Sequence, residues 1–181
     1  MTTQLLAVAS AADILPSYRQ TPVGLLLEYQ NLQRPFDHYS TAQLLVGMCM
    51  DNRKMLRLPD NFAYILRAGG ANFRRHQFKI SFAIAIGGVR AIALIGHDRC
   101  GMVGLRARRD AFIRGLVENA GWAAEEAAAH FDRYAPDFEI TDAAEFVCAE
   151  ARRLQQCYPK VLVAPLFYRL DEGRLYQLQA M

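Results

Sequence analysis

The sequence predicts an α/β protein with a central, mostly parallel sheet of four to five strands flanked by helices. Three segments carry this prediction because each is a continuous apolar run, as in strands buried on both faces: residues 44–49, 62–68 and 91–96. An apolar helix expected over residues 80–86 separates the last two. A chain of 181 residues is long enough for one such domain with a substantial core.

The first 40 residues show no clear strand pattern. Two short helical segments are expected, at residues 11–15 and 23–32, and prolines at positions 16, 22 and 35 interrupt them. We therefore predict an N-terminal helical arm over residues 1–40, which lies across its own domain or across a partner subunit. Residues 41–181 are expected to form a single α/β domain.

The second half of the chain is expected to be helical first and extended last. Residues 103–156 have helical patterning, and residues 122–134 are rich in alanine and glutamate, which favour helices. Asp142, with Glu145 three residues later, predicts a capped helix start. Residues 161–168 and 174–178 then predict two strands joined by a turn at 171–173.

Charge and hydropathy exclude several classes of partner. The net charge is only +3, and the basic residues are scattered among acidic ones, which argues against a nucleic-acid partner. No apolar run reaches the roughly 18 residues of a membrane span. The apolar stretch at residues 5–12 lacks the basic flank of a signal peptide, so the sequence predicts a cytoplasmic protein without a membrane partner.

Four cysteines in a reducing compartment are expected to be thiols or metal ligands. Cys148 and Cys157 fall on one predicted helix, on opposite faces and about 13 Å apart along its axis. They cannot form a disulfide within that helix, so we interpret both as structural.

The other two cysteines belong to a pattern that predicts a metal site. Cys49 ends the first buried strand, and His97 and Cys100 follow the third. Because the carboxyl ends of parallel strands meet at one edge of a sheet, these residues are expected to converge. Taken singly, each is more often a buried thiol or a hydrogen-bonded core histidine. Together, two thiolates and an imidazole suit Zn²⁺, and three protein ligands leave a fourth position open for catalysis.

Asp51 and Arg53 follow Cys49 closely and are candidate catalytic residues. Two positions apart in an extended segment, they would share a side and form a bidentate pair that keeps Asp51 ionised. Such a pair is usually a surface contact of little energetic value. Beside a metal ion it instead orients a carboxylate.

The motif Cys-x-Asp-x-Arg at residues 49–53, followed by His-x-x-Cys-Gly at residues 97–101, resembles the β-class carbonic anhydrases. Residues 67–70, 81–101 and 167–175 are also similar to that family, so the resemblance covers roughly residues 44–178. The helical insert after Met102 and the Cys-Met-Asp opening are similar to the family's shorter prokaryotic branch. Ala68 stands where the family usually has asparagine. The glutamine that helps to hold bicarbonate in some branches has no clear counterpart, although Gln43 is adjacent to the first predicted strand.

The resemblance implies a Zn²⁺ cofactor and reversible hydration of carbon dioxide to bicarbonate by a zinc-bound hydroxide. It implies that Asp51 orients the hydroxide, or moves onto the zinc as a pH-dependent fourth ligand. It also implies a homodimer or a multiple of dimers. Two thiolates cancel the charge of Zn²⁺ and make its bound water less acidic, so activity is expected to rise with pH.

Two other functions stay open at this point. The same site would suit a hydrolase of COS or CS₂, which a long, narrow apolar channel would distinguish. A catalytically silent zinc-binding protein would have the ligands without the activity. By their ordinary pKa, His38, His76 and His130 are candidates for a proton shuttle, but each is more often a surface histidine and none is assigned.

Overall fold

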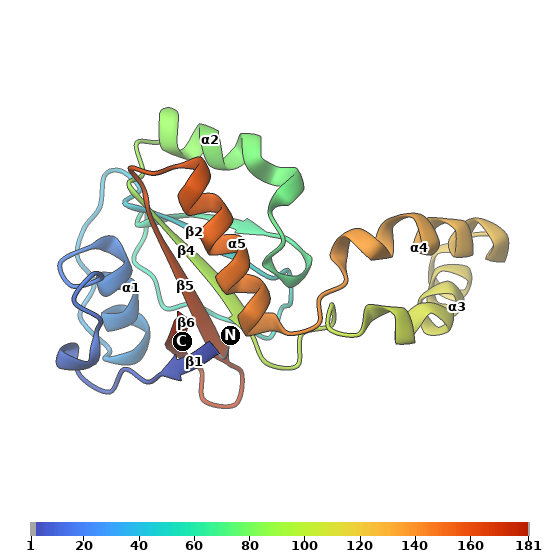
Figure 1. The fold of residues 1–181 in the computed structure, drawn as a ribbon, viewed down its shortest axis with the longest axis horizontal. Coiled ribbons are helices and arrows are strands. Elements are labelled where there is room, and N and C mark those ends of the chain that lie inside the picture. The colour runs from blue at the N-terminus through green and yellow to red at the C-terminus, as the bar shows by residue number, and fades with distance from the viewer. Residues whose placement is uncertain (1–2, 181) are drawn as a thin grey trace.

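The computed structural model describes residues 3–180 and places six strands in one mixed sheet (Figure 1). The strand order is β1-β6-β5-β4-β2-β3. The four strands from β5 to β3 run parallel, and β6 and β1 continue the sheet antiparallel at one edge. The strands are β1 (Thr3–Leu6), β2 (Leu44–Met48), β3 (Ala63–Arg67), β4 (Ala91–His97), β5 (Leu162–Arg169) and β6 (Arg174–Ala180).

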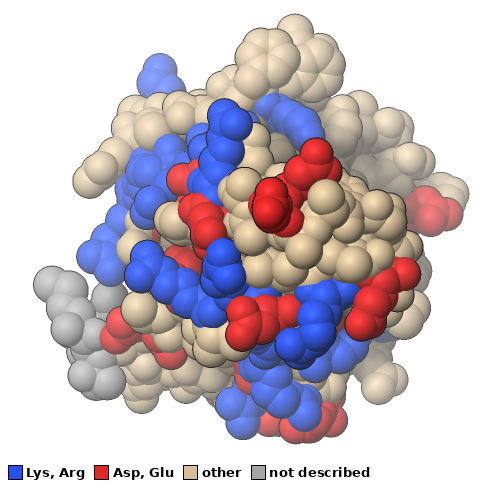
Figure 2. All heavy atoms as spheres, turned by 90° about the vertical axis from the view of Figure 1, so that its right-hand side faces the viewer, with Lys and Arg blue, Asp and Glu red and all other residues tan. Residues whose placement is uncertain are grey.

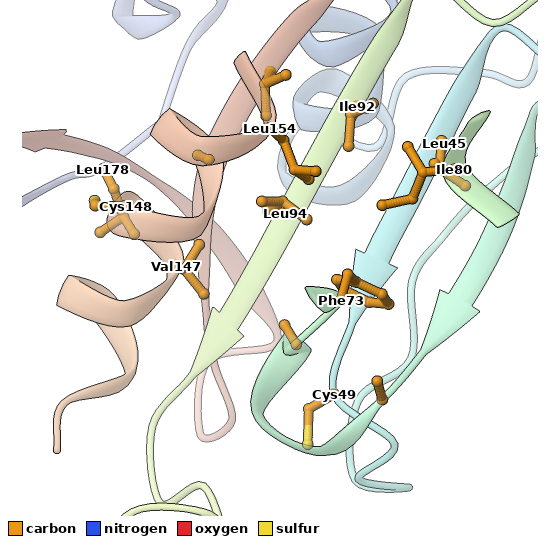
Figure 3. Packing of buried hydrophobic residues seen from close by; sticks show 14 of the residues in the cluster. Leu45, Cys49, Phe73, Ile80, Ile92, Leu94, Val147, Cys148, Leu154 and Leu178 are labelled. Atoms are coloured by element: carbon orange, nitrogen blue, oxygen red, sulfur yellow. The ribbon is translucent and has the colours of Figure 1, made fainter. Parts of the chain in front are cut away.

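Helices cover both faces of this sheet. α1 (Pro22–Asn31) packs on one face, and α2 (Gln77–Ala85) and α5 (Ala143–Cys157) pack on the other. Successive residues of β4 alternate between the two cores, because neighbouring side chains of a strand point to opposite faces. Figure 3 shows Ile92 and Leu94 on the face that carries Leu154 of α5. β2 and β4 are buried along their whole length, which explains their continuous apolar sequences.

The N-terminal segment differs from the predicted helical arm. It contributes a sixth strand, β1, which pairs with β6 at the far end of the chain. β1 has only four residues and no alternating pattern, and its pairing depends on a partner about 170 residues away, so local sequence does not reveal it. Of the first helix expected, only a single 3₁₀ turn forms (Ala11–Asp13).

The same segment lies across its own domain. Gln177 of β6 is fully buried, accepts a hydrogen bond from the Leu15 N–H at 2.8 Å and donates one to the Asp13 carbonyl at 3.0 Å. Asn31, the last residue of α1, accepts from the Leu175 N–H at 2.9 Å and donates to the Leu175 carbonyl at 2.7 Å. These side chains satisfy backbone groups that would otherwise be unpaired, and they fix residues 8–31 to the sheet.

The predicted helical insert is a hairpin of two helices that projects from the body of the molecule (Figure 1). α3 (Arg109–Ala120) ends at Gly121, whose φ of 72° suits glycine, and α4 (Ala124–Phe138) runs back toward the sheet. Figure 2 faces this hairpin, where basic and acidic side chains are interleaved around an uncharged area. Arg109 pairs with Asp132 at 2.7 Å, which accounts for part of that mixing.

The predicted start of the last helix is confirmed, since the Asp142 side chain accepts a hydrogen bond from the Glu145 N–H at 2.8 Å.

Within residues 3–180, every helix falls short of the length and apolar character needed to cross a membrane.

Candidate metal centre

Two adjacent parallel strands bring the predicted ligands together. β2 pairs with β4 in a register that sets Met48 opposite Ile95. Cys49 follows β2 directly, and His97 is the last residue of β4, so both lie at the same edge of the sheet. Figure 3 shows Cys49 just beyond the end of its strand. Arg99 has a left-handed φ of 52°, within the tight turn that leads from His97 to Cys100.

The three ligand residues form a compact and buried cluster. The two sulfur atoms of Cys49 and Cys100 are 4.0 Å apart, and both lie within 4.8 Å of a ring nitrogen of His97. Two sulfurs bound at about 2.3 Å to one tetrahedral zinc ion would be about 3.8 Å apart. The observed spacing therefore fits a shared ion closely.

His97 is prepared to donate a lone pair to such an ion. Its Nδ1 lies 2.8 Å from the Asp98 carbonyl, which can only accept, so Nδ1 carries the proton and Nε2 carries the lone pair. Nε2 is buried and has no hydrogen-bond partner among the described residues. An unpartnered buried nitrogen is costly unless something binds it, and a metal ion between the two thiols would do so.

The sulfur atoms of Cys49 and Cys100 lie within hydrogen-bond distance of each other. The hydrogen bond from the Cys100 thiol lowers the pKa of Cys49, and the Gly70 N–H also donates to the Cys49 sulfur, at 3.4 Å. The same contact with Cys49 raises the pKa of Cys100. Zinc binds cysteine as thiolate, so an ion at this position would bind both sulfurs with loss of their protons.

Asp51 and Arg53 form the predicted bidentate pair. Arg53 Nε donates to Asp51 Oδ1 at 2.9 Å, and Arg53 Nη2 donates to Oδ2 at 2.5 Å. These bonds hold the pKa of Asp51 well below its usual range, so the carboxylate is ionised at neutral pH. Arg53 Nη2 also donates to the Arg99 carbonyl at 3.0 Å, which ties this loop to the turn that carries Cys100.

Two further side chains support the centre, and the sequence alone assigned a role to neither of them. Arg67, at the end of β3, donates to the carbonyls of Cys49 and Asp51 at 3.2 and 3.3 Å. The Asp98 side chain accepts from the Leu170 N–H at 2.8 Å and so fixes the turn after β4 to the β5–β6 hairpin. The position of Arg67 at the end of β3, next to β2, indicates that its side chain lies near the centre. No local sequence pattern indicates the role of Asp98.

Other candidate residues lie away from the ligands or have other partners. Gln43 precedes β2, at the opposite end of that strand from Cys49, and its side chain donates to the Thr41 carbonyl at 2.8 Å. His38 is exposed. His130 is on the hairpin, where it packs against Trp122 and Tyr134. The structure thus brings together the three ligands and the Asp51–Arg53 pair, and leaves Gln43 outside this group.

An apolar cavity of about 280 Å³ adjoins the centre. Its lining includes Met50 and Met102, which lie one residue after Cys49 and two residues after Cys100, and Gly69, which precedes the Gly70 that donates to the Cys49 sulfur. Its other walls come from the helical hairpin and include Phe112, His130, Phe131 and Tyr134. The hairpin therefore builds a hydrophobic recess next to the candidate metal centre.

No family model and no curated protein matches the sequence. Solved structures do match the fold. A carbonic anhydrase from Glaciozyma antarctica is 22% identical, with a TM-score of 0.61, and the match covers 93% of this chain and 98% of that one. A β-carbonic anhydrase from Trichomonas vaginalis is 17% identical, with a TM-score of 0.63 and coverages of 93% and 97%. A carbon disulfide hydrolase is 19% identical, with a TM-score of 0.56 and coverages of 78% and 80%.

The predicted resemblance is therefore confirmed for the architecture, while the assignment to a shorter prokaryotic branch stays a prediction. The mixed sheet, the flanking helices and the extensive coverage agree with one another. The chain has the fold of the β-carbonic anhydrases.

Proposed function

We propose that this chain is a zinc-dependent carbonate dehydratase of the β-carbonic anhydrase family, which reversibly hydrates carbon dioxide to bicarbonate. The observation that carries the proposal is the convergence of Cys49, His97 and Cys100 on one point, where the buried Nε2 of His97 has no hydrogen-bond partner from residues 3–180. The Asp51–Arg53 pair supports it, since a carboxylate held ionised beside a metal centre suits hydration chemistry.

Cys49, His97 and Cys100 would hold the zinc ion. When bound, zinc lowers the pKa of a water ligand toward neutrality and so supplies a nucleophile. We also propose a cytoplasmic location, where a reducing environment keeps the two thiol ligands available.

Asp51 and Arg53 would act on the reacting groups around the ion. The Asp51 carboxylate can only accept hydrogen bonds, so it orients a water or hydroxyl group whose proton points toward it. Arg53 keeps Asp51 from taking up a proton. To become a fourth ligand, Asp51 would have to give up its bidentate contact with Arg53, so the observed pairing favours the orienting role.

A second candidate is hydrolysis of COS or CS₂ at the same centre. The apolar cavity between the ligand-bearing loops and the helical hairpin would accept such uncharged molecules, and a carbon disulfide hydrolase is among the similar structures. Activity toward CS₂ in the absence of carbon dioxide hydration would establish this alternative. Zinc binding without either activity would establish a catalytically silent zinc protein.

We further propose that the protein is a homodimer or a multiple of dimers. Phe78 and Phe82 of α2 and the following Ile86 recur every four residues on one exposed face, and Phe78 is 82% exposed. Beside them, β3 is an edge strand with Tyr64 and Ile65 partly exposed. A second copy of the chain would cover this apolar surface and the unpaired strand edge together.

The dimer surface can be tested by Phe78→Glu, which places a charge on the most exposed of the apolar side chains of the proposed interface. We expect the wild type to elute as a dimer or larger assembly in size-exclusion chromatography with light scattering, and the variant to shift to the monomer. Val117→Glu, an exposed apolar position on α3, serves as the control and should leave the assembly unchanged. A monomeric wild type would refute the proposal.

The ligand assignment predicts that Cys100→Ser loses stoichiometric zinc and carbon dioxide hydration together, because a serine hydroxyl is a poor ligand for zinc compared with a thiolate. Cys148→Ser is a matched control, since Cys148 and Cys100 are each 4% exposed. It should keep zinc in metal analysis. Retention of one zinc ion per chain in Cys100→Ser would contradict the assignment.

The role of Asp51 predicts that Asp51→Asn keeps its zinc but loses hydration activity by a factor of about 10² or more. Asp132→Asn is the control, because Asp132 is held by Arg109 in a similar bidentate pair far along the chain. Its activity should be close to that of the wild type in a stopped-flow assay. An Asp51→Asn variant with full activity would show that the carboxylate is dispensable.

A further inference from the structure

Lys54 is a buried lysine at the edge of the candidate metal centre. Of the three lysines in the chain, Lys79 and Lys160 are exposed, whereas Lys54 is only 2% exposed. Its Nζ donates one long hydrogen bond, to the Asp51 carbonyl at 3.4 Å, and has no carboxylate within salt-bridge distance among the described residues. Burying an ammonium group is costly unless negative charge compensates it.

The compensating charges belong to the metal centre. Burial lowers the pKa of Lys54, and the negative charges of Cys49, Asp51 and Cys100 counteract that effect. Arg67 is the positive group that opposes them. The Asp51 carbonyl accepts from both Lys54 and Arg67, and Arg67 also donates to the Cys49 carbonyl, so the ammonium of Lys54 lies beside the loop that carries Cys49.

The net charge of the metal centre gives the position of Lys54 a function. Two thiolates and one neutral imidazole already cancel the charge of a bound Zn²⁺. An anion added there leaves a net negative charge in a buried site, which is unfavourable without a nearby cation. Arg53 is paired with Asp51 through both carboxylate oxygens, whereas the ammonium of Lys54 forms no ion pair within the part of the chain that the structure describes.

We propose that Lys54 is an electrostatic positioning residue of the centre, whose buried ammonium stabilises a small anion, such as bicarbonate, at the metal. The inference rests on the proposed function, and specifically on a bound zinc ion. The ordinary alternative is that the four methylene groups of Lys54 merely fill a gap in the core, where the charge would contribute nothing.

Lys54→Met separates these roles, because methionine keeps the apolar stem and removes the charge. The full-length protein is loaded with Co²⁺ in place of zinc, and its visible absorption is titrated with thiocyanate, an anion, and with imidazole, a neutral ligand. We expect Lys54→Met to weaken thiocyanate binding about ten- to a hundredfold and to leave imidazole binding within about twofold, since only the anion interacts with the missing charge. Lys54→Arg should restore thiocyanate binding, and Lys160→Met should match the wild type.

A folded, metal-loaded Lys54→Met protein with wild-type affinity for thiocyanate would overturn the proposal. Equal weakening of both ligands would also overturn it, because a disturbed core affects both. If Lys54→Arg does not fold, the comparison of the two ligands in Lys54→Met still decides. A further outcome is a wild type that binds thiocyanate in a way that Lys54→Met weakens and yet lacks hydration activity. That result would refute the proposed enzyme and support this inference. A wild type that takes up no metal would refute both.

Discussion

The parallel pairing of β2 with β4 is the constraint on which the site depends. Cys49 and Cys100 are 51 residues apart, and only the register of these two strands brings their sulfur atoms to 4.0 Å. Both strands are buried along their whole length between two helical layers, so a shift in register would expose apolar side chains on both faces. The hydrophobic core therefore fixes the geometry of a site at the carboxyl edge of the sheet, where Cys49 and Cys100 are themselves part of the buried cluster.

Supporting contacts then hold the ligand loops against each other. Arg53 reaches from the loop after β2 to the Arg99 carbonyl, and Arg67 reaches from β3 to the Cys49 and Asp51 carbonyls. Asp98 joins the turn after β4 to the β5–β6 hairpin. Hydrogen bonds between side chains and backbone carbonyls thus connect the ends of β2, β3 and β4 around one small cluster. These contacts limit how far the three candidate ligands can move apart.

The parts of the molecule that depend on local sequence patterns were predictable from the sequence. Continuous apolar runs identified β2 and β4, and the positions of Cys49, His97 and Cys100 at strand ends predicted their convergence. β1 was missed because a four-residue strand is defined by its distant partner. Lys54 was missed because a lysine is normally exposed, and its burial follows only from how the loop after Arg53 folds back. The apolar cavity depends on the angle of the projecting hairpin, which no periodicity encodes.

We propose that two thiolates and one imidazole from Cys49, Cys100 and His97 hold a zinc ion. X-ray absorption spectroscopy at the zinc edge, on the full-length protein purified under reducing conditions, identifies the atoms bound to the metal. We expect two sulfur neighbours at about 2.3 Å and nitrogen or oxygen neighbours at about 2.0–2.1 Å. A zinc ion with no sulfur neighbours, or a protein that binds no zinc, would contradict it.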